Sequence, residues 1–169
     1  MLEIDIPGTG NMRLTDLVLD YNGTIACKGM LISGVKERLQ TLCQKLTVHI
    51  VTADTFGTAQ NIIRSSFAKE LAAGRICIEV LPAPEERSCD EAQAKLAILE
   101  AIGPASCCAM GNGRNDVLML KAAALSFCIL DGEGCAPQAF ASAKIAVRDI
   151  LSALELLLDT RCCIATLRI

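Results

Sequence analysis

Apolar runs and amphipathic stretches alternate along the chain, and this alternation predicts its secondary structure. Short apolar runs predict strands at 17–19, 46–51, 76–81, 106–110, 125–130 and 145–147. Apolar residues at helical spacing predict two helices that begin after Ser33 and Ser88, and others at 56–71, 116–124, 137–143 and 150–158. Strands that alternate with helices favour a parallel sheet covered on both faces. The sequence therefore predicts an α/β fold.

Local signals indicate where several of these helices begin and end. Ser33 can cap the helix that follows it, and Ser88 with Glu91 three places later can form a capping box. Gly74 can end the helix at 56–71 in a left-handed conformation, and Gly103 with the proline after it ends the helix that carries Lys95.

The composition indicates one packed globular domain that spans residues 1–169. Hydrophobic residues make up 52% and charged residues 21% of the chain. The net charge is −3 and no Lys/Arg block occurs, which argues against nucleic-acid binding. The apolar run 150–158 is far shorter than the roughly 20 residues of a membrane span. Glu3 and the lack of a basic segment before an apolar run argue against a signal peptide, so we expect a cytoplasmic protein.

The chain contains 10 cysteines, but their spacing does not fit a metal centre. No CxxC pair occurs, and the neighbouring pairs at 107–108 and 162–163 would point to opposite faces of a strand. We interpret the cysteines as reduced, buried, small hydrophobic residues. His49 lies inside a strand pattern, and we interpret it as a packed or edge residue rather than a catalytic one.

Polar residues follow several predicted strands at the points where the strands end. Asp20 follows the first strand, Thr52 and Asp54 follow the second, and the segment 111–116 follows the fourth, while Lys95 lies on the helix after the third. Ligands bind beyond the carboxyl ends of parallel strands. We therefore expect these residues to share one rim of the sheet.

These residue types suit phosphoryl transfer. An aspartate can attack phosphorus as a nucleophile when a divalent cation brings the two anions together. Thr52 offers a hydroxyl group and Lys95 a positive charge to phosphoryl oxygens. The backbone amides of residues 21–24 can form a nest around the same oxygens, and Gly23 permits a close approach. Asp54 equally suits the cap of a helix that begins near Phe56.

Four segments in this order resemble the motifs of the haloacid dehalogenase (HAD) superfamily: Asp20-Tyr-Asn-Gly-Thr24, Thr52-Ala-Asp54, Lys95 and Gly111-Asn-Gly-Arg-Asn-Asp116. Within it, residues 14–168 look most like the phosphorylation domain of P-type ATPases and the soluble P-type ATPase-like HAD hydrolases. The resemblance implies a Rossmann-like fold of three α/β/α layers with a central parallel sheet and a short β-hairpin flap at 25–32. The intervals between the motifs leave no room for a cap domain.

The resemblance also implies a role for each matched residue. The catalytic residues would be Asp20 as nucleophile, Asn22, Thr52 and Lys95. The phosphate would be bound by Tyr21, Gly23, Thr24, Thr52, Ala53, Lys95 and Asn115. The implied cofactor is Mg²⁺, with Asp20, Asn22, Asn112 and Asp116 at the metal site.

Two of these residues depart from the family pattern. Phosphatases of the superfamily have an aspartate at the position of Asn22, where it protonates the leaving group and later activates water. Asparagine cannot exchange a proton at neutral pH, so a contribution of about 10²–10⁴-fold should be missing. At the position of Asn112 the family has a magnesium-binding aspartate, whereas Asn112 offers a neutral carbonyl oxygen. We therefore expect slow dephosphorylation and a weaker metal site.

Two functions are compatible with this pattern. The first is a slow magnesium-dependent phosphohydrolase that acts through an aspartyl-phosphate at Asp20. The second is a catalytically weak HAD-like module that binds phosphate, metal or a protein partner. For the first, we expect a phosphorylated small molecule or a phosphoprotein as substrate, in contact with Cys27, Lys28 and Met30 of the flap. Because capless members of the superfamily often close their sites by oligomerising, we also expect a homo-oligomer.

Overall fold

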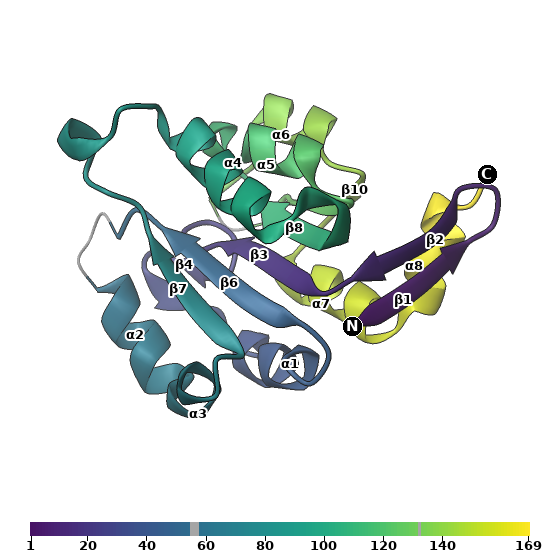
Figure 1. Ribbon diagram of the computed structural model, residues 1–169, viewed down its shortest axis with the longest axis horizontal. Coiled ribbons are helices and arrows are strands. Elements are labelled where there is room, and N and C mark those ends of the chain that lie inside the picture. Colours follow the sequence, from purple (N-terminus) through teal and green to yellow (C-terminus); the bar gives the residue numbers. More distant parts are fainter. Residues whose placement is uncertain (55–57, 132) are drawn as a thin grey trace.

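A six-stranded parallel sheet forms the centre of the computed structural model, which describes residues 1–54, 58–131 and 133–169 (Figure 1). Its strand order is β10-β9-β8-β3-β6-β7, and every neighbouring pair is parallel. The strands are β3 (Asp16–Asp20), β6 (Thr47–Thr52), β7 (Ile76–Val80), β8 (Cys107–Gly111), β9 (Leu125–Ile129) and β10 (Ile145–Val147). All six lie within or beside the apolar runs, so the predicted parallel sheet is confirmed.

Helices cover both faces of this sheet (Figure 1). They are α1 (Val35–Leu42), α2 (Ala59–Ser66), α3 (Ala68–Ala72), α4 (Glu91–Ile102), α5 (Val117–Ala122), α6 (Pro137–Ser142), α7 (Ile150–Leu158) and α8 (Thr160–Leu167), with 3-10 turns at Pro84–Glu86, Pro104–Ser106 and Arg114–Asp116. Leu17 and Leu19 of β3 pack in the core shared with α1 and α7. Val18, which points to the opposite face, packs in the core shared with α4, α5 and α6. This alternation confirms the three-layer α/β/α arrangement.

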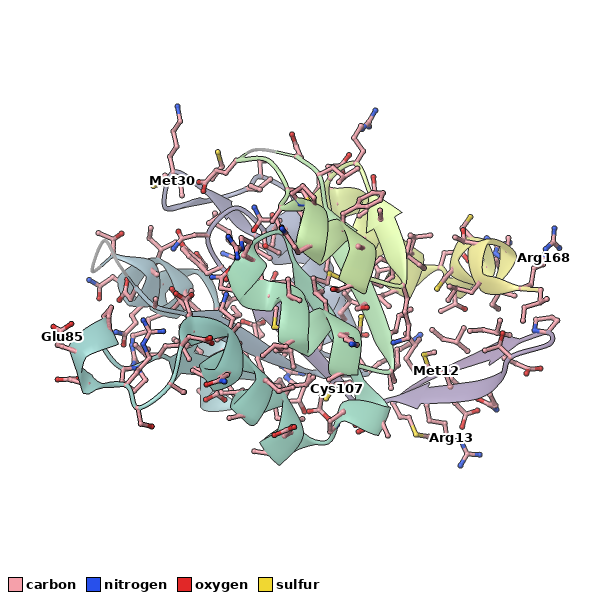
Figure 2. The ribbon with its side chains drawn as sticks, turned by 90° about the horizontal axis from the view of Figure 1, so that it is seen from above. Met12, Arg13, Met30, Glu85, Cys107 and Arg168 are labelled. Atoms are coloured by element: carbon pink, nitrogen blue, oxygen red, sulfur yellow. The ribbon has the colours of Figure 1, made fainter. Side chains whose placement is uncertain are left out.

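A small flap follows β3, as the resemblance implied. It consists of β4 (Ala26–Cys27) and β5 (Met30–Leu31), which pair antiparallel around Lys28 and Gly29. Both turn residues have positive φ, 51° and 77°, as a two-residue hairpin turn matched to the strand twist requires. The hydroxyl group of the buried Tyr21 donates to the carbonyl of Gly29 at 3.0 Å and ties the flap to the end of β3. Figure 2 shows Met30 of the flap on the side of the molecule opposite to Cys107, where β8 begins.

An N-terminal hairpin outside the central sheet was not predicted. It consists of β1 (Leu2–Ile6) and β2 (Gly10–Leu14), paired antiparallel, and it projects from one end of the molecule beside α8 (Figure 1). Ile4, Ile6 and Leu14 are buried in the same core as Cys163 of α8. The amide of Ile169 donates to the carbonyl of Pro7 at 3.4 Å, so the last residue of the chain lies beside the turn of this hairpin.

The structure corrects both predicted helix caps. Gly34, not Ser33, stands at the N-cap of α1, with φ of 88° and no side-chain hydrogen bond. Asp90, not Ser88, caps α4, and its carboxylate accepts from the amide of Gln93 at 2.8 Å. In both cases the cap lies one or two residues closer to the helix than the serine does.

The helix expected at 56–71 is two helices in the structure. Phe67, with φ of −127° and ψ of 31°, separates α2 from α3 and is fully buried. The expected start near Phe56 lies outside the described residues. Within the described ranges, every helix is too short or too polar to cross a lipid bilayer.

The buried face of the N-terminal hairpin should contribute measurably to stability. Ile4→Ala removes a side chain that is fully buried between the hairpin and the core shared with α8, so we expect a loss of about 2–5 kcal/mol in the free energy of unfolding. Glu3→Ala is the matched control on the exposed face of β1, and removing its exposed pair with Arg13 should cost less than about 1 kcal/mol. Urea denaturation measures both, and equal losses would contradict a stabilising role for this face.

Candidate active site

A buried lysine joins two carboxylates at the carboxyl ends of the central strands. Asp20 ends β3, Asp116 lies in the turn after β8, and Lys95 comes from the middle of α4. The ammonium nitrogen Nζ of Lys95 lies 2.6 Å from Oδ1 of Asp20 and 2.7 Å from Oδ1 of Asp116. All three residues are buried. Three separate segments predicted to share one rim are therefore joined by one buried ionic network.

Backbone amides hold Asp116 from its other side. Oδ2 of Asp116 accepts from the amide of Asn112 at 2.9 Å and from that of Gly113 at 2.8 Å. The carboxylate lies directly against Gly111, where an added Cβ would meet Oδ2 of Asp116 at 2.5 Å. Only a glycine at position 111 leaves room for this carboxylate. The loop after β8 therefore holds the carboxylate of Asp116 in place independently of its contact with Lys95.

The hydroxyl group of Thr24 lies between the side chains of Asp20 and Asn112. The hydroxyl group of Thr24 lies 3.1 Å from Oδ2 of Asp20 and 3.4 Å from Oδ1 of Asn112. The side-chain amide of Asn112 donates to the carbonyl of Gly134 at 2.8 Å, which turns its oxygen toward the site. Gly23, with φ of 75°, lets the two loops meet, because an added Cβ would lie 2.5 Å from Nδ2 of Asn112.

The electrostatics of the site follow from burial and from the short charge separations. Burial, and next the neighbouring Asp116, raise the pKa of Asp20 from 3.8 to about 7, although Lys95 and Thr24 act in the opposite direction. Burial alone would lower the pKa of Lys95, but the carboxylates of Asp20 and Asp116 outweigh it and raise this pKa above its usual value. Lys95 therefore stays protonated, whereas Asp20 changes charge near neutral pH.

Thr52, at the end of β6, keeps its hydroxyl proton available. Its Oγ1 accepts from the amide of Asp54 at 2.9 Å, so the O–H group can still donate to a ligand. The carboxylate of Asp54 accepts from the amide of Ala59 at 2.8 Å and from the side chain of Gln60 at 3.2 Å. Thr58 stands at the N-cap position of α2, so Asp54 satisfies an amide of the first turn of this helix from outside the cap position. Ala53 lies half-buried between Thr52 and Asp54.

Three of the four backbone amides expected to form a phosphate nest donate within the chain. The amide of Tyr21 donates to the carbonyl of Val51 at 3.1 Å, and that of Gly23 donates to the carbonyl of Ala26 at 2.8 Å. The amide of Thr24 makes a longer contact of 3.4 Å to the carbonyl of Tyr21. A phosphate contact by these amides would therefore require the loop to rearrange.

Glu91 is a member of the site that the sequence reasoning did not identify. Its Oε1 accepts from the side-chain amide of Asn115 at 2.7 Å and lies 3.6 Å from Nζ of Lys95. Asn115, expected to bind phosphate, thus bonds to α4 in this conformation. Glu91 and Lys95 are four residues apart on one helix, a spacing that places two side chains on the same face and could have revealed the pair.

The residues present suit a hard divalent cation. The side-chain oxygens of Asp20 and Asn112 both lie within 3.4 Å of the Thr24 hydroxyl oxygen, so they face one small region. Carboxylate and amide oxygens are ligands that Mg²⁺ accepts. Asn22 is half-buried in the turn next to Asp20, and its role at the metal site stays a prediction.

A cavity of about 690 Å³ opens beside the flap. It is lined by Lys28, Gly29, Met30, Thr58, Asn61, Ile62 and Glu133. These residues come from the flap, from the start of α2 and from the loop after β9, and the segments follow strand ends at the same rim as Asp20. Lys28 and Met30, two of the expected flap contacts, thus line a space large enough for a small organic molecule.

Comparison with known proteins places the chain in a family. It is 41% identical over 78 residues to the uncharacterized protein MJ0073 of Methanocaldococcus jannaschii, and the match covers 44% of this chain and 84% of that protein. The chain belongs to the family of MJ0073. No family model matches the sequence.

Solved structures confirm the HAD fold. The chain resembles the 3-deoxy-D-manno-octulosonate 8-phosphate phosphatase of Moraxella catarrhalis, crystallised with magnesium, phosphate and a KDO molecule, with a TM-score of 0.62 over 90% of each chain at 13% identity. It also resembles the catalytic domain of the CPx-ATPase CopB-B, with a TM-score of 0.53 at 20% identity, over 76% of this chain and 46% of that one. At these identities the likeness establishes the fold.

The raised pKa of Asp20 gives stability a defined pH dependence. Folding raises this pKa from 3.8 to about 7, so the folded state binds the proton more tightly, and the resulting stability is lost as the pH rises from about 4 toward 7. Asp20→Asn removes this effect. We expect the variant to gain stability relative to the wild type as the pH rises. In the absence of divalent cations, the difference in the free energy of unfolding (variant minus wild type) should increase by about 1–3 kcal/mol between pH 5 and pH 8.

Urea denaturation at several pH values measures this difference. Asp5→Asn is the control, because it removes the same charge from an exposed position on β1. A difference for Asp20→Asn that does not change with pH, or an equal change for both variants, would contradict the raised pKa of Asp20.

Proposed function

We propose that this protein is a magnesium-dependent phosphohydrolase that acts through an aspartyl-phosphate at Asp20. The observation that supports this most directly is the buried network of Asp20, Lys95 and Asp116 at the strand ends, with the free hydroxyl proton of Thr52 at the end of the adjacent strand. Such a network places a nucleophile beside a positive charge at a site where ligands of parallel α/β proteins bind.

In the first step, a carboxylate oxygen of Asp20 attacks the phosphorus atom of the substrate. The bond from phosphorus to the leaving oxygen breaks, and that oxygen keeps the electron pair and takes its proton from solvent, since Asn22 has none to give. Lys95 and the hydroxyl proton of Thr52 stabilise the negative charge on the phosphoryl oxygens. The product of this step is an aspartyl-phosphate and a free alcohol.

In the second step, water attacks the phosphorus atom of the aspartyl-phosphate. The bond from phosphorus to the Asp20 oxygen breaks, which releases inorganic phosphate and restores the carboxylate. Asn22 cannot accept the proton of the attacking water, so this step proceeds without a general base at that position. The phosphorylated protein should therefore persist longer than in enzymes that have a carboxylate there.

Magnesium, when bound by Asp20, Asn112 and Asn22, would neutralise the charge between the nucleophile and the phosphate. It would also favour ionised Asp20, whose pKa of about 7 otherwise leaves part of the nucleophile protonated at neutral pH. Asp116, which is fixed by Lys95 and by two backbone amides, would support this metal site.

The cavity beside the flap favours a phosphorylated small molecule as substrate. Its lining combines the apolar Met30 and Ile62 with the polar Asn61 and Glu133, as sites for small organic ligands do. Glu133 accepts from the amide of Lys28 at 3.0 Å and so holds the flap tip to the opposite loop. The leaving group would occupy this cavity while its phosphate reaches Asp20.

A second function is favoured by Asn22 and Asn112. Both replace carboxylates that the HAD resemblance leads us to expect, and both losses weaken turnover more than phosphate binding. A module that binds phosphate or a protein partner without hydrolysis is the alternative. Phosphoryl transfer to Asp20 distinguishes the two functions.

Asp20→Asn should abolish phosphoryl transfer. With acetyl phosphate and magnesium, the wild type should gain the mass of one phosphoryl group, stable in acid, and should hydrolyse para-nitrophenyl phosphate slowly. Both signals should vanish in Asp20→Asn, since an amide is not a nucleophile toward phosphorus. Intact-mass measurement and release of para-nitrophenol report them, and Asp5→Asn serves as a control that keeps both. No phosphorylation of the wild type by either donor would favour the binding module.

Asn22→Asp should accelerate the second step. The new carboxylate can activate water, so decay of the phosphorylated protein should become faster by up to about 10²–10⁴-fold. The decay is followed by intact mass after removal of acetyl phosphate. Asn11→Asp, an equal change at an exposed position of β2, should leave the decay unchanged. If Asn22→Asp decays at the wild-type rate, slow turnover has a cause other than the missing carboxylate.

A further inference from the structure

A second cluster of metal-binding side chains lies on the sheet, away from the candidate active site. Asp16 of β3, His49 of β6, and Cys77 and Glu79 of β7 come from three neighbouring strands. His49 pairs with Cys77 in the register of β6 and β7, and Glu79 follows two residues later on the same face. The donor atoms of His49, Cys77 and Glu79 lie within 4.8 Å of one another.

The imidazole ring of His49 is held between two carboxylates. Nε2 lies 3.1 Å from Oδ1 of Asp16, and Nδ1 lies 3.3 Å from Oε1 of Glu79. The other oxygen of Asp16 accepts from the hydroxyl group of Thr15 at 2.6 Å, which fixes this carboxylate. If Nε2–H donates to Asp16, the lone pair of Nδ1 faces the lone pairs of the Glu79 carboxylate. These lone pairs repel one another, and a cation bound between them removes the repulsion.

This arrangement matches a recurrent device of metal sites. A histidine that binds a metal through one nitrogen usually donates its other N–H to a carboxylate, which sets the tautomer and the ring orientation. Asp16 stands in that position. Nitrogen, thiolate and carboxylate ligands at about 2.0–2.3 Å suit Zn²⁺, whereas Mg²⁺ prefers oxygen ligands. Small side-chain rotations would bring donor atoms already within 4.8 Å of one another to that distance from one ion.

The cluster is reachable from solvent and separate from the catalytic residues. The side chains of His49, Asp16 and Glu79 are 12%, 17% and 35% exposed. Asp16 and Asp20 stand at opposite ends of β3, about 13 Å apart at about 3.3 Å per residue. A cation here would therefore not be the ion of the proposed phosphoryl transfer.

We propose that His49, Cys77 and Glu79 bind one Zn²⁺-like transition-metal ion, with Asp16 as the residue that positions the histidine. The ion joins β6 to the edge strand β7, and water completes its coordination. The proposal does not depend on the phosphohydrolase function, because it shares no residue with that site.

Cobalt titration of the folded protein in excess Mg²⁺ tests the proposal. Co²⁺ reports tetrahedral thiolate coordination through visible d–d bands and a near-ultraviolet charge-transfer band, which Mg²⁺ does not give. We expect these bands to saturate at one Co²⁺ per chain and to disappear on addition of Zn²⁺. Cys77→Ser should lose the charge-transfer band, and His49→Gln should weaken binding at least about 10-fold.

Four further variants separate this cluster from other groups. Cys162→Ser and Cys135→Ser should keep the bands, because neither cysteine belongs to the cluster. Cys162 is exposed on α8, and Cys135 lies beside Cys128, with 2.7 Å between their Sγ atoms. Asp20→Asn should also keep them. Asp16→Asn should weaken binding about 10-fold or more while the charge-transfer band remains, as expected of a positioning residue. Bands that survive in Cys77→Ser, or no thiolate band in the folded wild type, would overturn the proposal.

Discussion

The position of one buried ammonium group determines the rest of the candidate site. Lys95 is fully buried, and its Nζ lies 2.6 and 2.7 Å from two carboxylates that come from different segments. Breaking a buried ion pair on one side costs about 3–5 kcal/mol, because it leaves a charge without compensation. α4, the end of β3 and the loop after β8 must therefore keep their relative positions. The same constraint that holds these segments together keeps Asp20 beside a positive charge.

The fold meets this constraint with small residues at the points of closest approach. Gly23 faces the side chain of Asn112, and Gly111 faces the carboxylate of Asp116, with room for no further atom in either place. The parallel sheet brings the strand ends together, and the glycines let the loops beyond them interlock. Exchange of Gly23 would displace the side chain of Asn112, and exchange of Gly111 would displace the carboxylate of Asp116. The geometry of the candidate site thus depends on the absence of a side chain at these two positions.

The sequence predicted the sheet and the shared rim because each leaves a local signal, whereas the flap was expected only from the family resemblance. Apolar runs mark the six strands, and polar residues at their ends mark the rim. The N-terminal hairpin was missed although Leu2, Ile4 and Ile6 alternate as a half-buried strand should. The cluster around His49 could not be predicted, because it depends on the register between β6 and β7, which spacing along the chain does not contain.

The two asparagines of the site act in the same direction within the proposed mechanism. Lys95 with ionised Asp20 and Asp116 leaves one net negative charge in the buried network. A neutral Asn112 adds no charge to this network. Compared with an aspartate at the same position, it makes the site attract a divalent cation less strongly and repel a phosphate dianion less strongly. Asn22 leaves water without a base after the phosphoryl group has been transferred. Within this mechanism, both residues would favour a state in which the phosphoryl group stays on the protein, and this arrangement of charges would promote persistence of that state rather than rapid turnover.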